Sequence, residues 1–179
     1  VSTGMAGHDL LLAYYGDVAF RDRGVEPEQA GRLTSVAAFA QLLGALLVAV
    51  VGGRLRPRRG LAFGALCAAA AAVVTSVATT STGFLVVAAL SGLYMVSRQT
   101  CHGPQLMRLA GASDPTAALS LGMAVASVAQ ALLPFAAGAL RPVTGFPPLL
   151  HVVTGLTLLG AWFLLRRVGD GPSAGVRTT

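Results

Sequence analysis

The chain has 179 residues, of which 54% are hydrophobic and only 11% are charged. Because a soluble domain usually has about 25% charged residues, this composition excludes a water-exposed globular shell and predicts an integral membrane protein in a lipid bilayer. The net charge of +6 comes from arginines spread through loops. They form no basic face and have no aromatic platform, so nucleic acid is excluded as a partner.

Long uncharged stretches alternate with short arginine-bearing loops. A helix of about 20 apolar residues crosses the hydrocarbon core of a bilayer. The uncharged stretch 60–97 is too long for one crossing and is interrupted by polar residues at 80–83, which indicates two helices. We therefore predict an all-α membrane protein with six transmembrane helices, at 5–20, 30–53, 60–79, 84–109, 115–140 and 147–167.

The first predicted helix, 5–20, contains two carboxylates. Asp9 and Asp17 are eight residues apart and so lie roughly on one face. Either carboxylate is a candidate proton site if it lies at mid-depth. The alternatives are that Asp9 belongs to a cytoplasmic N-terminus and that Asp17 is solvated near the outer end of the helix.

The loop after the second predicted helix is strongly basic. Basic residues of short loops accumulate on the cytoplasmic side of a membrane, so we expect this loop there, and six crossings then place both termini in the cytoplasm. We expect a multi-pass protein of the cell membrane, with a transmembrane domain at 1–168 and a disordered cytoplasmic tail at 169–179. The basic loop residues are Arg54, Arg56, Arg58 and Arg59.

The fourth predicted helix carries an ionisable residue within its apolar sequence. An arginine at the centre of a membrane helix costs roughly 2.5–3.5 kcal/mol on insertion scales, so such a residue is a functional candidate by default. Tyr94, Arg98 and His102 follow each other at intervals of four, and Gln105 comes three residues later. At 3.6 residues per turn, these four side chains share one face.

This polar stripe, defined by Tyr94, Arg98, His102 and Gln105, allows two interpretations. Arg98 binds an anionic or hydroxyl-rich substrate or pairs with a carboxylate of the first helix, and His102 carries a proton, because histidine titrates near neutral pH. Alternatively, Arg98 extends towards the inner membrane interface, and His102 is a packed polar residue near the helix end.

The sequence contains no motif of a catalytic or metal centre. Neither Gly-x-Ser-x-Gly nor His-Glu-x-x-His occurs, and no phosphate-binding loop is present. Cys101 and His102 are adjacent, so their side chains point about 100° apart on a helix and do not form a dyad. Cys67 and Cys101 have no zinc-site spacing. We therefore predict that the chain is not an enzyme and has no cofactor and no metal.

Three segments resemble one half of a transporter of the major facilitator superfamily. The pair Tyr14-Tyr15, followed by 23–33, resembles the first helix and outer loop of a half. The segment 52–60 resembles the basic loop between the second and third helices, although Gly53 replaces the acidic residue of that motif. The segment 104–140 resembles the fourth and fifth helices of a C-terminal half.

The resemblance implies a six-helix half-bundle whose first and fourth helices line a central cavity. Tyr14, Tyr15 and the polar stripe would then lie along the path of a small-molecule substrate, with transport by alternating access. The pattern is similar to permeases for the efflux of sugars or drugs. Six helices make one half, so the partner is a missing N-terminal half, which we favour, or a second copy. The alternative function is a non-transporting multi-pass scaffold or assembly subunit.

Overall fold

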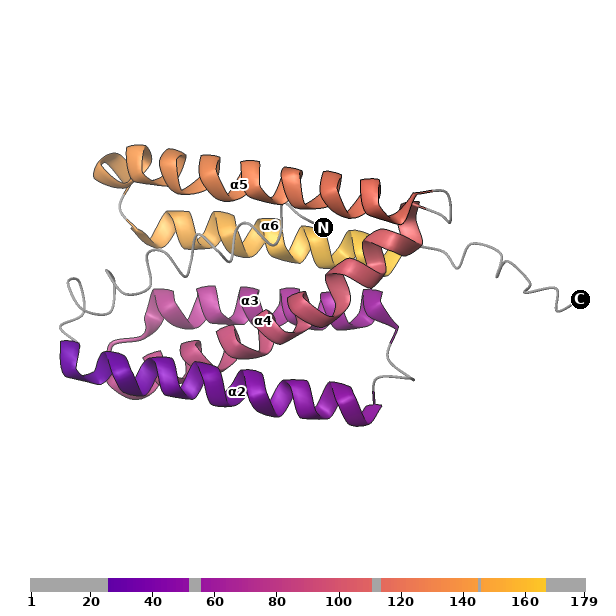
Figure 1. Ribbon diagram of the computed structural model, residues 1–179. Coiled ribbons are helices and arrows are strands. Elements are labelled where there is room, and N and C mark those ends of the chain that lie inside the picture. The colour runs from indigo at the N-terminus through magenta and orange to yellow at the C-terminus, as the bar shows by residue number, and fades with distance from the viewer. Residues whose placement is uncertain (1–25, 52–55, 111–113, 145, 167–179) are drawn as a thin grey trace, which may run out of the picture.

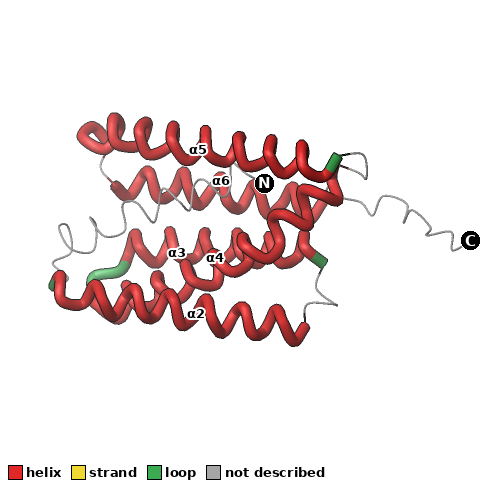
Figure 2. Tube along the Cα trace, in the orientation of Figure 1, coloured by secondary structure: helices red, strands yellow, loops and turns green. Residues whose placement is uncertain are grey.

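A computed structural model describes residues 26–51, 56–110, 114–144 and 146–166 (Figure 1). All regular structure in these ranges is helical (Figure 2), which confirms the predicted all-α class. A short 3-10 turn, η2 (Pro27–Gln29), precedes the long helices. These are α2 (Ala30–Val51), α3 (Pro57–Val77), α4 (Ser81–Ala110), α5 (Pro115–Thr144) and α6 (Phe146–Arg166).

Several sequence predictions lie outside the described residues. They are the first helix, 5–20, with Asp9, Tyr14, Tyr15 and Asp17, the basic-loop residue Arg54, and the tail 169–179. These predictions stay predictions. The other five predicted helices each correspond to one described helix, with ends that differ by at most four residues.

The helices form a bundle in which α3 and α4 are central. The helix α3 packs against both α4 and α6, and α4 packs in addition against α2 and, less extensively, against α5. In Figure 1, α4 crosses the bundle obliquely, from beside α2 towards the start of α5. The helices α2 and α5 therefore flank α4 on opposite sides.

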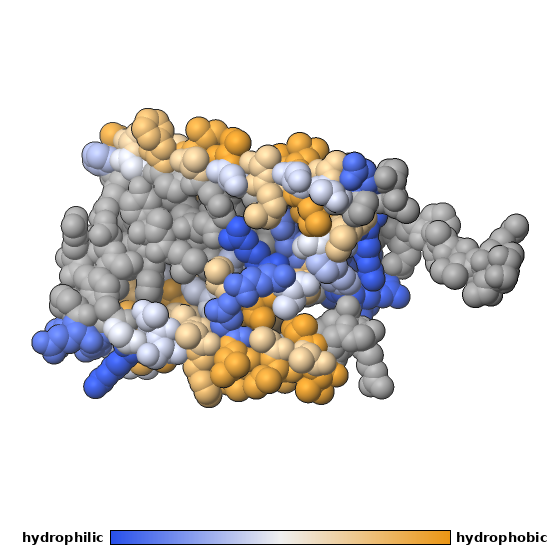
Figure 3. Space-filling view, in the orientation of Figure 1, coloured by the Kyte–Doolittle hydropathy of each residue, from blue (hydrophilic) through white to orange (hydrophobic). Residues whose placement is uncertain are grey.

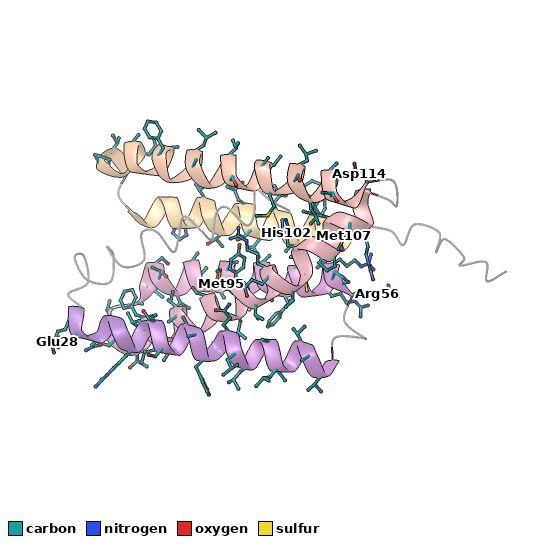
Figure 4. The ribbon with its side chains drawn as sticks, in the orientation of Figure 1. Glu28, Arg56, Met95, His102, Met107 and Asp114 are labelled. Carbon is teal, nitrogen blue, oxygen red and sulfur yellow. The ribbon has the colours of Figure 1, made fainter. Side chains whose placement is uncertain are left out.

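Successive helices run in opposite directions, so charged residues collect at the two ends of the bundle. Glu28 lies at one end, whereas Arg56 and Asp114 lie at the other (Figure 4). The C-terminal ends of α4 and α6 bring further arginines to the Arg56 end. The described arginines of that end are Arg56, Arg58, Arg59, Arg108 and Arg166.

Local capping explains where two helices begin. Asp114 accepts a hydrogen bond of 2.9 Å from the backbone N–H of Ala117, which confirms Asp114 as the cap before Pro115. Thr80 accepts one of 3.3 Å from the N–H of Gly83, so α4 begins at Ser81, within the segment predicted to be a loop.

The start of α3 also differs from the sequence prediction. This helix begins at Pro57, because proline has the backbone angle of a helix and lacks an N–H that the first turn cannot satisfy. Arg58 and Arg59 therefore lie in the first turn of α3 and not in a loop, while Arg56 is the residue before the helix.

The outer surface of the bundle is apolar. Within the described residues, three helical segments are long and apolar enough to cross a membrane, namely Gly31–Val50, Pro57–Val77 and Ser81–Arg108, and α6 contains a shorter apolar stretch, Thr154–Phe163. Large apolar side chains are exposed along α2 and α5, as Val50 (85% exposed) and Phe135 (78%) illustrate. Such surfaces suit lipid, because soluble proteins rarely expose large apolar patches.

Candidate functional site

The polar stripe extends from the middle of a long helix towards its C-terminal end. The 30 residues of α4 span about 45 Å at 1.5 Å per residue, more than the roughly 30 Å of a hydrocarbon core. Along the axis, Arg98 lies about 4 Å and His102 about 10 Å from the helix midpoint. In Figure 4, Met95, His102 and Met107 follow one another along α4 towards the Arg56 end.

Tight contacts show which side of α4 meets α2. A Cβ added to Gly92 would collide with the backbone carbonyl oxygen of Ala37, and a Cβ added to Gly44 would lie 2.6 Å from Cγ1 of Val96. The absence of side chains at Gly92 and Gly44 therefore lets these two helices approach closely, as small residues do in membrane helix packing.

A second side of α4 meets α3. A Cβ added to Gly64 would lie 2.7 Å from the Cβ of Ser97, and one added to Gly60 would collide with the sulfur of Cys101. Tyr94 joins the same buried cluster as Cys101 and Leu61. At about 100° per residue, Arg98 and His102 occupy the remaining sector of α4.

The structure buries most of the polar stripe within the protein. Tyr94 is 2% exposed, Gln105 is 3% exposed and His102 is 8% exposed, whereas Arg98 is half-buried. A face that is polar and withdrawn from the outer surface avoids lipid, as the sequence pattern indicated. The assignment of these four residues to a substrate path stays a prediction.

His102 has an unusual environment. Its Nε2 atom is buried and has no hydrogen-bond partner among the described residues. A buried polar atom without a partner costs about 1–3 kcal/mol, so a nitrogen in this state is a candidate to bind a ligand group or a proton. Nearby hydroxyl groups differ, because those of Ser97 and Thr100 in α4 and of Thr75 in α3 donate hydrogen bonds to backbone carbonyls of their own helices.

A polar contact that sequence reasoning missed joins α2 to α4. Gln41 Nε2 donates a hydrogen bond of 2.9 Å to Gln99 Oε1. Figure 3 shows hydrophilic residues gathered in the middle of one face, between apolar rows over α5 and α2. Both glutamines are uncharged, so the pattern of charged residues does not reveal them, and the available signal is an amide within an apolar span.

Near the polar stripe, the described residues carry positive charge and no negative charge. The described acidic residues are Glu26, Glu28 and Asp114, which all lie outside the five long helices. Arg98 therefore brings positive charge to the middle of spans that contain no carboxylate. Asp9 and Asp17 lie outside the described residues. An ion pair between one of them and Arg98 therefore stays a prediction.

The end of α6 has the features expected of an interfacial anchor. The guanidinium carbon of Arg166 lies 5.1 Å from the centroid of the Trp162 ring, and Trp162 is 45% exposed. Tryptophan and arginine favour the level of the lipid headgroups. No group of three potential metal ligands occurs within the described ranges.

Comparison with known proteins agrees with this geometry. The family model of the Major Facilitator Superfamily matches residues 4–178, almost the whole chain. The comparisons with curated proteins and with solved structures gave no match. The extent of the family match and the all-helical bundle confirm the resemblance seen in the sequence. The chain belongs to the major facilitator superfamily, a family of transmembrane transporters.

Proposed function

We propose that this chain forms one six-helix half of a secondary transporter that moves a small polar solute by alternating access, and that α4 lines the path. The observation that carries the proposal is the buried His102 Nε2 without a partner in the described residues, one helical turn from Arg98. Arg98, about 4 Å from the midpoint of α4, lies near the depth at which we expect the substrate, and His102 lies about 6 Å nearer the Arg56 end.

The energetics of Arg98 support a functional role. Its insertion costs roughly 2.5–3.5 kcal/mol, and the adjacent buried imidazole adds a further cost. A helix that serves only as a scaffold gains nothing from either group, whereas a transporter uses both to bind a polar solute. The resemblance to sugar and drug efflux permeases makes export the direction that we propose.

The other wall of the path comes from outside the described helices. We propose that the predicted helix 5–20 contributes Tyr14 and Tyr15 beside the polar stripe, with Asp9 or Asp17 as a proton site. A second six-helix half, in a longer protein or in a second copy, completes the path. In this proposal the arginine-rich end of the bundle lies on the cytoplasmic side of the cell membrane, because basic residues accumulate on that side.

A transport assay tests the proposal. Inside-out vesicles that contain the protein encoded by the full reading frame are offered labelled sugars, sugar acids and drugs. Wild-type protein accumulates at least one of them. Loss of a charged hydrogen bond worth about 1.5–3 kcal/mol predicts that Arg98→Ala lowers this transport at least about tenfold.

Two variants serve as controls. Arg108→Ala removes an exposed arginine near the end of the same helix and leaves transport within about twofold of wild type, since its charge lies outside the path. Arg98→Lys keeps the charge and retains part of the activity. If Arg98→Ala transports as well as wild type, Arg98 is not part of the path.

A further inference from the structure

We propose that Gln41 and Gln99, together with Arg98, form a binding subsite for an organic anion that also carries hydroxyl groups, such as a sugar acid. The inference rests on the proposed function, because it takes α4 as a wall of the transport path. It adds a residue from α2 to that wall and names the class of substrate. Three observations support it: the depth of the amide pair along its helices, the exposure of Gln99 and the positive charge of Arg98.

The amide pair lies at the centre of both helices. Gln41 is about 1 Å along the axis from the midpoint of α2, and Gln99 is about 5 Å from the midpoint of α4. The hydrogen bond of 2.9 Å between them thus bridges the helices at the level where a bilayer is most apolar. Arg98 precedes Gln99 at nearly the same level, and its side chain leaves the helix about 100° away around the axis, so a solute must extend around α4 to reach both groups.

The amides keep most of their hydrogen-bonding capacity. One N–H of Gln41 and one acceptor position of Gln99 are used in the pair. The two side chains then retain roughly three N–H donors and three acceptor positions. Such a neutral array suits hydroxyl groups, which both donate and accept, and an apolar solute would leave it without partners.

The pair is not enclosed by the described helices. Gln99 is exposed and Gln41 is half-buried. An exposed amide facing lipid lacks the partners that every polar group needs in a bilayer, so this face meets water, a ligand or another part of the transporter. The side of α2 that suits lipid lies elsewhere. Phe39 is 60% exposed, and it lies at nearly the same depth as Gln41 but about 160° away around the helix axis.

Charge decides between ligand classes. The spans α2 to α6 contain Arg98 and no acidic residue in the described ranges. A positive charge within about 8 Å favours an anion over a cation by about fivefold at the dielectric constant of water. The guanidinium thus selects the anionic group, and the amides bind the hydroxyl groups.

Thiol labelling tests the subsite without knowledge of the substrate. In the full-length protein, with Cys67 and Cys101 replaced by alanine, Gln99→Cys is treated with membrane-impermeant methanethiosulfonates that are either anionic or cationic. Each rate is divided by the rate for a free thiol in solution. We expect Gln99→Cys to react from at least one membrane side, with a normalised preference for the anionic reagent of at least about fivefold.

Matched variants make the result specific. Phe39→Cys, at nearly the same depth on another side of α2, reacts with neither reagent. Adding Arg98→Gln to Gln99→Cys abolishes the preference for the anion. Gluconate slows the labelling at least about threefold more than hexanoate, which lacks hydroxyl groups, or glucose, which lacks charge, at equal concentration.

The outcomes separate this inference from the proposed function. If Arg98→Cys reacts and Gln99→Cys does not, the amide pair only clamps α2 to α4 and the inference is wrong, while the path stands. If neither reacts, both proposals fail. Equal rates with the two reagents, or equal protection by gluconate and hexanoate, contradict the substrate class alone.

Discussion

Replacement of Gly92 by alanine tests the close packing that sets the position of α4. A Cβ at this position would collide with the backbone carbonyl oxygen of Ala37 and would lie 3.0 Å from the Cβ of Ala40. A backbone carbonyl does not rotate away as a side chain does, so α4 must shift from α2. Overpacking typically costs 1–3 kcal/mol, against a gain of up to about 1 kcal/mol from helix propensity.

The net expectation for Gly92→Ala is a loss of about 1 kcal/mol in the free energy of unfolding. For a chain of this size, that loss lowers the melting temperature in detergent by about 2–4 °C. The matched control is Gly103→Ala in the same helix, where a Cβ would make an ordinary contact of 3.6 Å with Leu119. Gly103→Ala leaves the melting temperature unchanged or raises it.

The same pair of variants decides whether the packing argument is sound. Because Gln41 and Gln99 bridge the same two helices, Gly92→Ala should also weaken their contact and alter labelling at position 99. If Gly92→Ala melts at the same temperature as Gly103→Ala, the approach of α4 to α2 is looser than described, and the packing argument for the site is wrong.

Two further predictions concern helix ends and orientation. Asp114→Ala removes the hydrogen bond from the N–H of Ala117 and should destabilise the protein by about 1 kcal/mol, measured as a lower melting temperature. Asp114→Asn keeps most of the stability, and equal losses in the two variants would refute the capping role. In a background without other cysteines, Arg108→Cys should react with an impermeant thiol reagent only from the cytoplasmic side, and Thr79→Cys only from outside. The reverse pattern would overturn the predicted orientation of the bundle in the membrane.

The sequence was sufficient to predict the five described helices because each contains a long stretch without charged residues. Helix ends were less predictable where polar residues belong to the first turn. Ser81 and Thr82 resemble a loop in composition, but the cap supplied by Thr80 allows α4 to begin there. Pro57 likewise begins α3 before its apolar run.

The candidate site was only partly predictable. Helical periodicity placed Tyr94, Arg98 and His102 on one face, but periodicity does not reveal which neighbour covers that face, so the burial of Tyr94 and His102 needed the packed structure. The contact of Gln41 with Gln99 depends on the rotation and crossing of two helices. No one-dimensional pattern contains that information.

The central claim is that the Arg98 face of α4 lines a path that opens to each side of the membrane in turn. The most direct test is the labelling of Arg98→Cys by an impermeant thiol reagent, added separately to right-side-out and inside-out vesicles, in the full-length protein without Cys67 and Cys101. Alternating access predicts reaction from both sides. Reaction from one side only, or from neither, would contradict the account.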